Sequence, residues 1–314
     1  MKLKLNYLIP YIVLFIIILV IGFLQHNVVN LEWLGIKTDS ILPLAFATVG
    51  QTLVLLTGGI DLSIGGIICI TNSLEAIKMT NNPINIIMFT IGMLLLGLIL
   101  GAINGLIIVK IRLQPFIATL ITWSIYGGIA LWILPTDRGN VPKSFISALL
   151  ARFGGIPVSL IIILILIGWW VYLQRIPFGK YILALGSNQK AAYLSGVNVD
   201  RIKIMVYAMS GFFAACAGVY RTAQVASGSP TAGNGFILTT VAAAVIGGTS
   251  LAGGEGSIIG SIIGACILKL LGDLLVFSGV SSYWVSLFQG LSLIIIIAIV
   301  SVSNLIKSRR KIRI

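Results

Sequence analysis

The sequence predicts an all-α integral membrane protein with about ten transmembrane helices, and three features of its composition and pattern support this fold class. Hydrophobic residues make up 58% of the 314 residues and charged residues only 9%. The mean hydropathy is +1.09, which lies far above that of soluble domains. Apolar stretches of about 20 residues, the length that crosses a bilayer, recur along the chain.

About ten apolar stretches are long enough to cross the membrane when their flanking residues are taken into account. We expect spans at 8–24, 41–57, 61–77, 84–109, 115–134, 157–175, 203–226, 234–248, 257–276 and 284–303. The first lacks the small-residue cleavage site of a signal peptide, and we therefore expect it to be retained. The eighth is short and is bounded by Gly235 on one side and by Gly247 and Gly248 on the other. Such breaks are typical of transporter regions that move, and they predict flexibility here.

Lysines and arginines predict the orientation, because loops rich in these residues stay in the cytoplasm. Most of the 21 lie at 2–4, 110–112, 175–203 and in a basic tail at 304–314. An even number of spans would place all four regions on one side. The opposite side would hold only Lys37, Lys78, Arg138, Lys143 and Arg152, while Arg221 and Lys269 fall within or near the ends of spans. We therefore expect both termini to be cytoplasmic.

The charges and cysteines exclude several classes of function. The net charge of +13 lies on loops and termini, where it meets anionic headgroups rather than nucleic acid. The three cysteines lie in apolar stretches without metal-site spacing, and we expect them to be small packing residues. One histidine and eight acidic residues leave little material for acid-base or metal chemistry. No GxxxxGK[ST] phosphate loop is present, since the only Gly-Lys pair, Gly179 and Lys180, precedes Tyr181. Any ATP hydrolysis must come from another subunit.

Two stripes of glycine recur at intervals of four residues and predict tight helix crossings. In lipid, small residues on one helix face let two backbones approach closely, and this packing drives association. The stripes consist of Gly97, Gly101 and Gly105 in the fourth span and Gly256, Gly260 and Gly264 in the ninth.

Polar residues inside the spans are candidates for a solute path. Asp61 follows Gly58 and Gly59, so it is placed either to cap the next helix or to act in function, because a carboxylate near membrane depth is costly. Neutral groups suit a hydroxylated solute, although they equally serve as contacts between helices. The path candidates are Thr48, Gln51, Asp61, Asn72, Asn104 and Thr119.

A polar segment at about 184–200 interrupts the apolar pattern on the predicted cytoplasmic side. We expect a short helix from Asn188 to Leu194, capped by Ser187 or Asn188 and ended by Gly196. Such a helix can lie on the membrane surface. Its small residues, which we expect to be exposed, instead favour close contact with another protein: Ala191, Ala192, Ser195 and Gly196.

The motifs together resemble one known family. The segments GGIDLSIG (58–65), PFIATL (115–120), ALGSNQKAAYLSGVNVDRIKI (184–204), SPTAG (229–233) and IGGTSLAGGEG (246–256) resemble the ribose-type permeases of bacterial ABC importers, within the branched-chain amino acid/ribose permease superfamily. The resemblance covers nearly the whole chain in the same order. It implies a single permease domain over 1–314 with the type II, vitamin B12-type importer fold in the bacterial inner membrane.

The resemblance also implies partners and roles. A second permease subunit, identical or not, an ATPase with two nucleotide sites and an extracytoplasmic sugar-binding protein would complete the importer, and ATP and Mg would bind to the ATPase rather than to this chain. The external loop at 135–156 would dock the binding protein through Arg138, Lys143 and Arg152, unless it is only a solvated loop. The coupling helix that meets the ATPase would comprise Gly186, Ser187, Asn188, Ala191, Ala192, Ser195 and Gly196.

The expected function is import of a monosaccharide, ribose or a related small sugar, by alternating access. After SPTAG this chain departs from the family, since Ile237 and Thr239 stand where relatives usually carry two acids. That departure keeps other solutes open, namely a furanone signal, a nucleoside or a branched-chain amino acid, as well as a heterodimer. A proton-coupled secondary transporter would bury several acids and an enzyme would cluster titratable groups, and both are less well supported.

Overall fold

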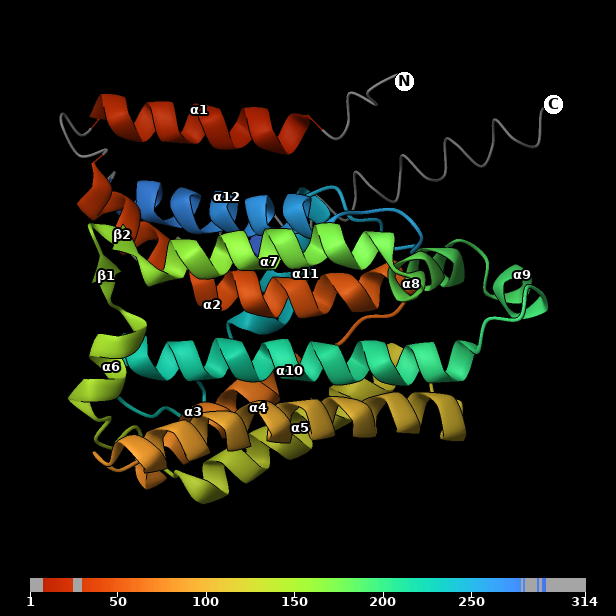
Figure 1. Cartoon of the computed structure of the whole chain (residues 1–314), viewed down its shortest axis with the longest axis horizontal. Coiled ribbons are helices and arrows are strands. Elements are labelled where there is room, and N and C mark those ends of the chain that lie inside the picture. Colours follow the sequence, from red (N-terminus) through yellow and green to blue (C-terminus); the bar gives the residue numbers. More distant parts are fainter. Residues whose placement is uncertain (1–7, 25–29, 278, 280–286, 288–289, 292–314) are drawn as a thin grey trace.

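The computed structural model of the chain describes residues 8–24, 30–277, 279, 287 and 290–291. The predicted tenth span at 284–303, apart from a few isolated positions, and the basic tail at 304–314 lie outside the described residues. In the part that is described, long helices lie side by side with their axes roughly parallel (Figure 1).

Each predicted span within the described part coincides with a helix, although several ends differ. The helices at the predicted spans are α1 (Ile9–Leu24), α2 (Leu31–Leu56), α3 (Ile64–Lys78), α4 (Pro83–Leu106), α5 (Pro115–Ile133), α7 (Val158–Arg175), α10 (Val199–Val225), α11 (Phe236–Ile246) and α12 (Ile258–Phe277). A π-helical turn, Ile107–Ile111, extends α4. The connecting elements are α6 (Lys143–Leu149), β1 (Arg152–Phe153), β2 (Ile156–Pro157), α8 (Pro177–Ser187) and α9 (Gln189–Leu194).

Six helices of the described part are long and apolar enough to cross a membrane. These are α2, α4 with its π turn, α5, α7, α10 and α12. Two apolar helices are shorter, namely α1 with 16 residues and α11 with 11. As the sequence predicted, α11 is bounded by Gly235 and Gly247. The chain is thus an all-α integral membrane protein.

Helix α2 begins at Leu31, whereas the sequence analysis expected it to begin at position 41. The first turn is stabilised by Asn30, whose side chain accepts a hydrogen bond from the Trp33 N–H at 2.8 Å. Glu32 lies in the same turn, where the positive end of the helix dipole favours an acidic side chain. The helix continues past Pro43, and the mixed polarity before position 41 had hidden its start.

Helices α2 and α10 form the centre of the molecule, and α4, α5 and α7 form much of its periphery. Helix α10 contacts α2, α3 and α4, and α12 contacts α2 and α11. In the most apolar window of α2, 83% of the residues are buried, compared with 17% in α4 and 28% in α5 and α7. The exposed side chains of the peripheral helices are large and apolar, as lipid contact requires.

The glycine stripe of α4 lies against the backbone of α10. A Cβ at Gly101 would clash with the carbonyl oxygen of Tyr207, and one at Gly105 would lie 2.7 Å from the Cα of Ile204. Gly97 likewise faces Gly211. Only a residue without a side chain permits this close contact between helices.

The second stripe behaves as a helix face only in part. Gly260 and Gly264 of α12 lie against the backbone of α11, at Gly247 and Ala243. The expectation that Gly256 shares this face is wrong, because α12 begins at Ile258 and Gly256 lies in the preceding loop. Its φ of 152° is a conformation that residues with a side chain rarely adopt, and a Cβ there would meet Thr249.

The two ends of the helical bundle carry different elements. Helices α8 and α9 lie at one end, and α6, β1 and β2 lie at the other (Figure 1). We name these the α9 end and the α6 end. At the α9 end the Gly254 N–H donates to the Leu56 carbonyl at 3.0 Å. At the α6 end Arg138 and Gly228 exchange two backbone hydrogen bonds, both 3.1 Å long.

Candidate functional site

The polar segment at the α9 end folds as the sequence predicted. Helix α9 spans Gln189–Leu194, and the Asn188 side chain caps it by accepting a hydrogen bond from the Ala191 N–H at 3.0 Å. Gly196 ends the segment with a φ of 83°, a left-handed conformation that favours glycine. The expected short helix, with Asn188 as its cap and Gly196 as its terminator, is therefore confirmed.

The exposed surface of α9 differs from the expectation at one position. Ala191, Ser195 and Gly196 are exposed, but Ala192 is buried, so the expectation that Ala192 faces outward is wrong. Ala192 belongs to the apolar cluster that also contains Val197, Val199 and Ile202. One face of α9 packs against the start of α10, and Ala192 lies on that face. The sequence of the segment alone did not show which face this would be.

Two large apolar side chains that the sequence analysis did not select project from α9. Tyr193 is 69% exposed and Leu194 is 82% exposed. Tyr193 also lines a groove with a volume of about 500 Å³, which we call the α9 groove. It is lined by Asn188, Gln189, Lys190, Tyr193, Val199 and Asp200. An exposed apolar pair beside a groove is typical of a protein contact surface.

Gly186 connects α8 to the centre of the molecule. A Cβ at this position would clash with the Leu56 carbonyl oxygen, at the end of α2, and with the Gly254 backbone nitrogen. Ser187 is exposed, and its hydroxyl donates to the Leu183 carbonyl at 2.9 Å. Of the predicted coupling residues, Gly186 thus contacts α2 and the 247–257 loop, while Ser187 and Asn188 lie on the surface.

Asp61 is fully buried and joins several segments, and it does not act as the N-cap of α3. The N-cap of α3 is Ser63, whose N–H and hydroxyl both donate to Asp61 Oδ1, at 2.9 and 2.5 Å. The hydroxyl of Ser210, on α10, donates to Asp61 Oδ2 at 2.7 Å. Both carboxylate oxygens therefore have partners, one of them 149 positions away in the sequence.

Two further path candidates lie around this carboxylate. Asn104, on α4, donates from its side-chain Nδ2 to the Ser63 hydroxyl at 2.7 Å. The hydroxyl of Thr119, on α5, lies 3.2 Å from the Ile60 carbonyl oxygen and 2.9 Å from the Pro115 carbonyl oxygen of its own helix. The structure therefore brings Asp61, Asn104 and Thr119 together around the loop between α2 and α3. We call these three residues, with Ser63 and Ser210, the Asp61 network.

The other three path candidates lie elsewhere. Asn72 joins α3 to the far end of α10, since its Nδ2 donates to the Thr222 hydroxyl at 2.9 Å and its Oδ1 accepts from the Ser229 N–H at 2.6 Å. Thr48 and Gln51 are fully buried on α2, and the side-chain polar atoms of Gln51 have no hydrogen-bond partner. None of the six candidates lines the cavity between α2, α10, α11 and α12, and their role in a path stays a prediction.

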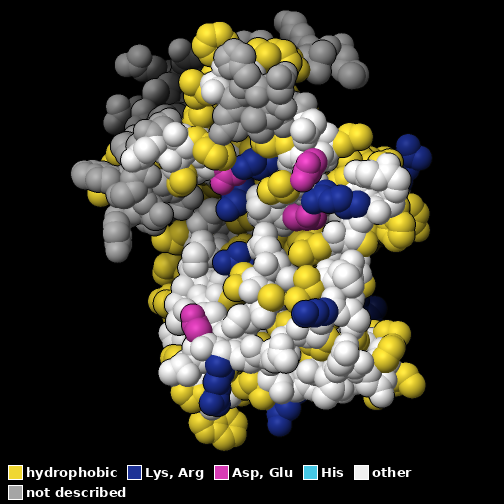
Figure 2. All heavy atoms as spheres, turned by 90° about the vertical axis from the view of Figure 1, so that its left-hand side faces the viewer, with side chains coloured by type: hydrophobic (Ala, Val, Ile, Leu, Met, Phe, Trp, Pro, Cys, Tyr) yellow, Lys and Arg dark blue, Asp and Glu magenta, His cyan; other side chains and the backbone are white. Residues whose placement is uncertain are grey.

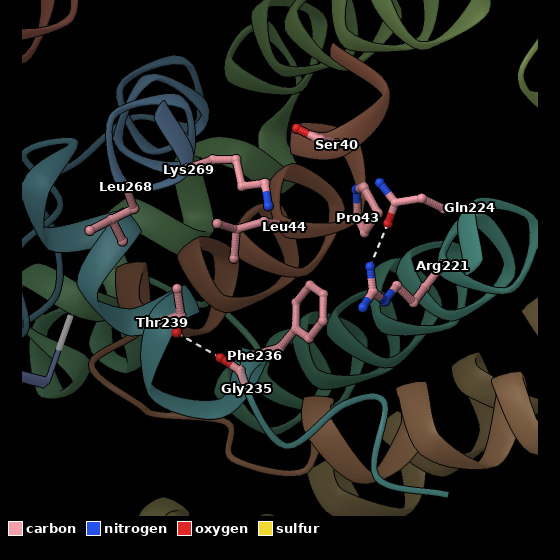
Figure 3. Close-up of a pocket in the computed structure, with 10 residues that line it drawn as sticks. All are labelled: Ser40, Pro43, Leu44, Arg221, Gln224, Gly235, Phe236, Thr239, Leu268 and Lys269. Atoms are coloured by element: carbon pink, nitrogen blue, oxygen red, sulfur yellow. Dashed lines mark hydrogen bonds between the residues drawn. The ribbon is translucent and has the colours of Figure 1, made fainter. Parts of the chain in front are cut away.

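A cavity of about 360 Å³ lies between α2, α10, α11 and α12 (Figure 3). We call it the basic cavity. It is lined by Ser40, Pro43, Leu44, Arg221, Gln224, Gly235, Phe236, Thr239, Leu268 and Lys269. The side chains of Lys269 and Arg221 reach toward it from α12 on one side and from α10 on the other. Both charges fall within predicted apolar spans, but no site was predicted for them from the sequence.

Thr239 and Ile237 stand where the resemblance led us to expect two acids in relatives, and the two side chains lie in different surroundings. Thr239 lines the basic cavity, and its hydroxyl donates to the Gly235 carbonyl at 2.6 Å. The Ile237 side chain lies against Gly65 of α3.

The three predicted docking residues are all at the α6 end, but their surroundings differ. Arg138 and Lys143 are exposed and line a groove of about 600 Å³ that runs from Ala76 to Asn81 and along the start of α6; we call it the Arg138 groove. Arg152 lies 3.5 Å from Asp39 of α2, so it is partly engaged within the chain. Figure 2 looks onto this end and shows lysine and arginine side chains spread over the face, beside a smaller number of acidic ones.

Within the described part of the chain, no three histidine, cysteine or acidic side chains come together as metal ligands. The three cysteines are free. Cys69 is buried on α3 and accepts a hydrogen bond from the Gly233 N–H at 3.2 Å, which fits its predicted role as a small packing residue.

Curated relatives align along most of this chain. It is 40% identical over 246 residues to the ribose import permease protein RbsC of Escherichia coli strain K12, and the match covers 76% of each chain. It is 36% identical over 293 residues to RbsC of Bacillus subtilis strain 168, covering 91% of this chain and 90% of the relative. The fructose import permease protein FruG of Bifidobacterium longum strain NCC 2705 is 32% identical over 302 residues, covering 92% and 88%.

No solved structure matches the chain. A family model described as the permease component of the branched-chain amino acid transport system matches residues 38–297. That range includes α9, the Asp61 network and the basic cavity. The chain therefore belongs to this family of transport permeases, and it is a multi-pass inner-membrane subunit of an ABC importer rather than an enzyme.

Proposed function

We propose that this chain is the permease subunit of an importer that carries a monosaccharide across the inner membrane at the expense of ATP. The observation that carries this proposal is the match over most of the chain to proteins named ribose and fructose import permeases. An importer of this kind also requires an ATPase and a substrate-binding protein.

The proposed fold is a single permease domain over 1–314, of the type II importer class, with about ten transmembrane helices and both termini in the cytoplasm. The helices found at the predicted spans support it. The basic residues Lys110, Arg112, Lys190 and Arg201 border the α9 end, which the positive-inside rule would place in the cytoplasm. The α6 end would then face outward.

ATP and Mg would bind to the partner ATPase, with two nucleotide sites, and no cofactor would bind to this chain. The proposed contact is α9 with its groove. Tyr193 and Leu194 would enter an apolar hollow of the ATPase, because a large exposed apolar pair gains free energy when it leaves water. Ala191, Ser195 and Gly196 would let the partner approach closely.

Movement of α9 would reach the solute through contacts that are present in the structure. Helix α9 follows α8 directly, and Gly186 of α8 lies against the end of α2 and against Gly254. The 247–257 loop that contains Gly254 joins α11 to α12. Since α2, α11 and α12 line the basic cavity, closure of the ATPase would change the shape of that cavity. This is the alternating-access step that we propose.

At the α6 end, the Arg138 groove offers two exposed cations to an acidic patch on the sugar-binding protein. A second permease subunit, identical or not, would cover part of the exposed apolar surface. The other candidate solutes are a branched-chain amino acid, which the family description names, a nucleoside or a furanone signal. A stand-alone secondary transporter has no comparable support.

The test is ATP-dependent uptake of labelled ribose, fructose and leucine by proteoliposomes that hold the permease, its ATPase and the binding protein. We expect uptake of a sugar but not of leucine. Leu194→Asp should lower ATPase co-purification and uptake by about tenfold or more, because it places a charge in an apolar contact. The matched variant Leu194→Met should retain both. Leucine uptake without sugar uptake would refute the sugar assignment, and full activity of Leu194→Asp would refute the α9 contact.

A further inference from the structure

We propose that the basic cavity holds the phosphate or carboxylate group of an acidic monosaccharide, so that the importer carries a negatively charged sugar. This inference rests on the proposed function as a sugar importer and specifies its solute. It depends on a geometric observation, namely two cations that face one cavity without an acidic partner.

Neither cation of the basic cavity is neutralised within the described part of the chain. Arg221 Nη1 donates to the Gln224 side-chain oxygen at 2.7 Å, which is a neutral acceptor, and Arg221 Nε is buried without a partner. The two ion pairs found among the described residues are Lys37 with Asp273 and Arg152 with Asp39, and neither includes Arg221 or Lys269.

The acidic residues of the chain are accounted for. All eight lie in the described part, and none lines the basic cavity. Asp273, one helical turn from Lys269 on α12, already pairs with Lys37. Asp39, next to Ser40, accepts hydrogen bonds from the hydroxyls of Ser159 and Tyr220, at 2.6 and 2.8 Å. These two acids, the closest in sequence to lining residues of the cavity, therefore have other partners, and the lining itself carries two cations and no acid.

An unpaired charge inside apolar spans is costly, and such residues are by default functional. A neutral sugar needs hydroxyl and amide groups, which Ser40, Gln224 and Thr239 supply. A neutral sugar, however, gives no reason for two cations in one cavity. A phosphate or carboxylate does, because charge-assisted hydrogen bonds to arginine and lysine are about twice as strong as neutral ones.

The rest of the cavity suits the same ligand. Helix α11 begins at Phe236, with Gly235 as an N-cap that provides no capping side chain, and both residues line the cavity, so the positive end of this helix dipole lies at its wall. The volume of about 360 Å³ lies in the range of small-molecule sites, which is roughly 300–1,000 Å³. Pro43, Leu44 and Phe236 provide an apolar wall for the carbon face of a sugar ring (Figure 3).

The test measures binding to the permease in complex with its ATPase, in nanodiscs made of neutral lipid. Ribose 5-phosphate and gluconate are the anionic probes, and ribose and glucose are the neutral ones, each titrated by calorimetry. We expect the anionic sugars to bind at least about tenfold more tightly than the neutral ones, since a charged hydrogen bond is worth that factor. Arg221→Gln and Lys269→Gln should each remove most of this difference, and Lys269→Arg should retain it.

Lys143→Gln serves as the matched control, because it removes one positive charge at the α6 end without touching the basic cavity. It should leave the preference for anionic sugars unchanged. Equal binding of charged and neutral sugars, or a preference that survives Arg221→Gln and Lys269→Gln, would overturn the inference.

Two further measurements separate the remaining explanations. If phosphatidylglycerol in the nanodisc stabilises the permease through Arg221 and Lys269, while soluble ribose 5-phosphate does not bind, the cavity holds a lipid headgroup and the inference is wrong. ATP-dependent uptake into proteoliposomes tests the underlying function. Uptake of neutral sugars alone would contradict the acidic solute but support the sugar importer, whereas uptake of no sugar at all would contradict both.

Discussion

The Asp61 network and the basic cavity both place ionisable side chains among apolar helices, but only those of the first have their partners within the protein. Both oxygens of Asp61 accept hydrogen bonds, from Ser63 and from Ser210, and the carboxylate is fully buried. Arg221 and Lys269 face an open cavity, with no acid on its lining. The first charge is enclosed by the protein, whereas the other two remain available.

This difference separates a structural charge from one that can bind a ligand. A buried carboxyl group whose two oxygens both accept hydrogen bonds fixes the elements that it joins, and here Asp61 joins the loop before α3 to α10. An unpaired charge has a cost within the protein that a ligand can offset. The hydrogen-bond inventory of a residue is therefore more informative about its role than its position in an apolar stretch.

The largest effect that would test the comparison is the loss of Asp61. Asp61→Ala leaves the Ser63 N–H and the hydroxyls of Ser63 and Ser210 without their acceptor in a fully buried site. We expect the free energy of unfolding to fall by about 3 kcal/mol or more. Thermal unfolding of the purified permease in detergent would measure this change.

The control makes the same substitution at an exposed acid. Asp137 lies in the exposed loop before α6, and Asp137→Ala should change the free energy of unfolding by less than about 0.5 kcal/mol. An Asp61→Ala protein as stable as Asp137→Ala would show that the Asp61 network does not hold α10 in place.

A smaller effect tests the helix contact beside this network. A Cβ at Gly101 would clash with the Tyr207 carbonyl oxygen of α10, whereas a Cβ at Gly92, on the same helix, would meet no atom within 4 Å. Gly101→Val should therefore lower the free energy of unfolding by about 1–3 kcal/mol. Thermal unfolding is again the measurement.

Gly92→Val is the matched control, since it makes the same change in helix propensity on α4 without the clash. It should leave the unfolding temperature nearly unchanged. Equal destabilisation by the two variants would mean that the loss arises from α4 itself and not from its contact with α10.

Features with a local cause were predictable from the sequence. The spans follow from runs of apolar residues, and α9 follows from its cap at Asn188 and its terminator at Gly196. Features that depend on residues distant in the sequence were not predictable. The partner of Asp61 on α10 and the burial of Ala192 against the start of α10 both require the tertiary arrangement.

The basic cavity shows the same limit. Arg221 and Lys269 stand out in the sequence as charges inside apolar stretches, and that alone makes them functional candidates. Their meeting in one cavity depends on the packing of α2, α11 and α12 against α10. A search for polar groups on α2 and α3 could identify the buried hydrogen-bonding residues, but it could not locate a cavity formed by four helices.

The smallest expected effect compares a paired lysine with an unpaired one in the same half of the molecule. Lys37 Nζ lies 2.5 Å from Asp273 Oδ2, and the two side chains are only 11% and 22% exposed. Lys37→Met leaves the Asp273 carboxylate without its partner, and we expect the free energy of unfolding to fall by about 1 kcal/mol. Lys37→Met with Asp273→Leu should recover part of that loss, because neither charge then remains.

Lys269→Met removes a cation that has no acidic partner among the described residues. In the ligand-free permease it should leave the unfolding temperature unchanged or raise it slightly, since an uncompensated charge near membrane depth disfavours the folded state. Ribose 5-phosphate should raise the unfolding temperature of the unaltered permease and of Lys37→Met with Asp273→Leu, but not that of Lys269→Met. A loss of stability in ligand-free Lys269→Met as large as that in Lys37→Met would mean that Lys269 supports the fold, and the contrast between an enclosed and an available charge would not extend to it.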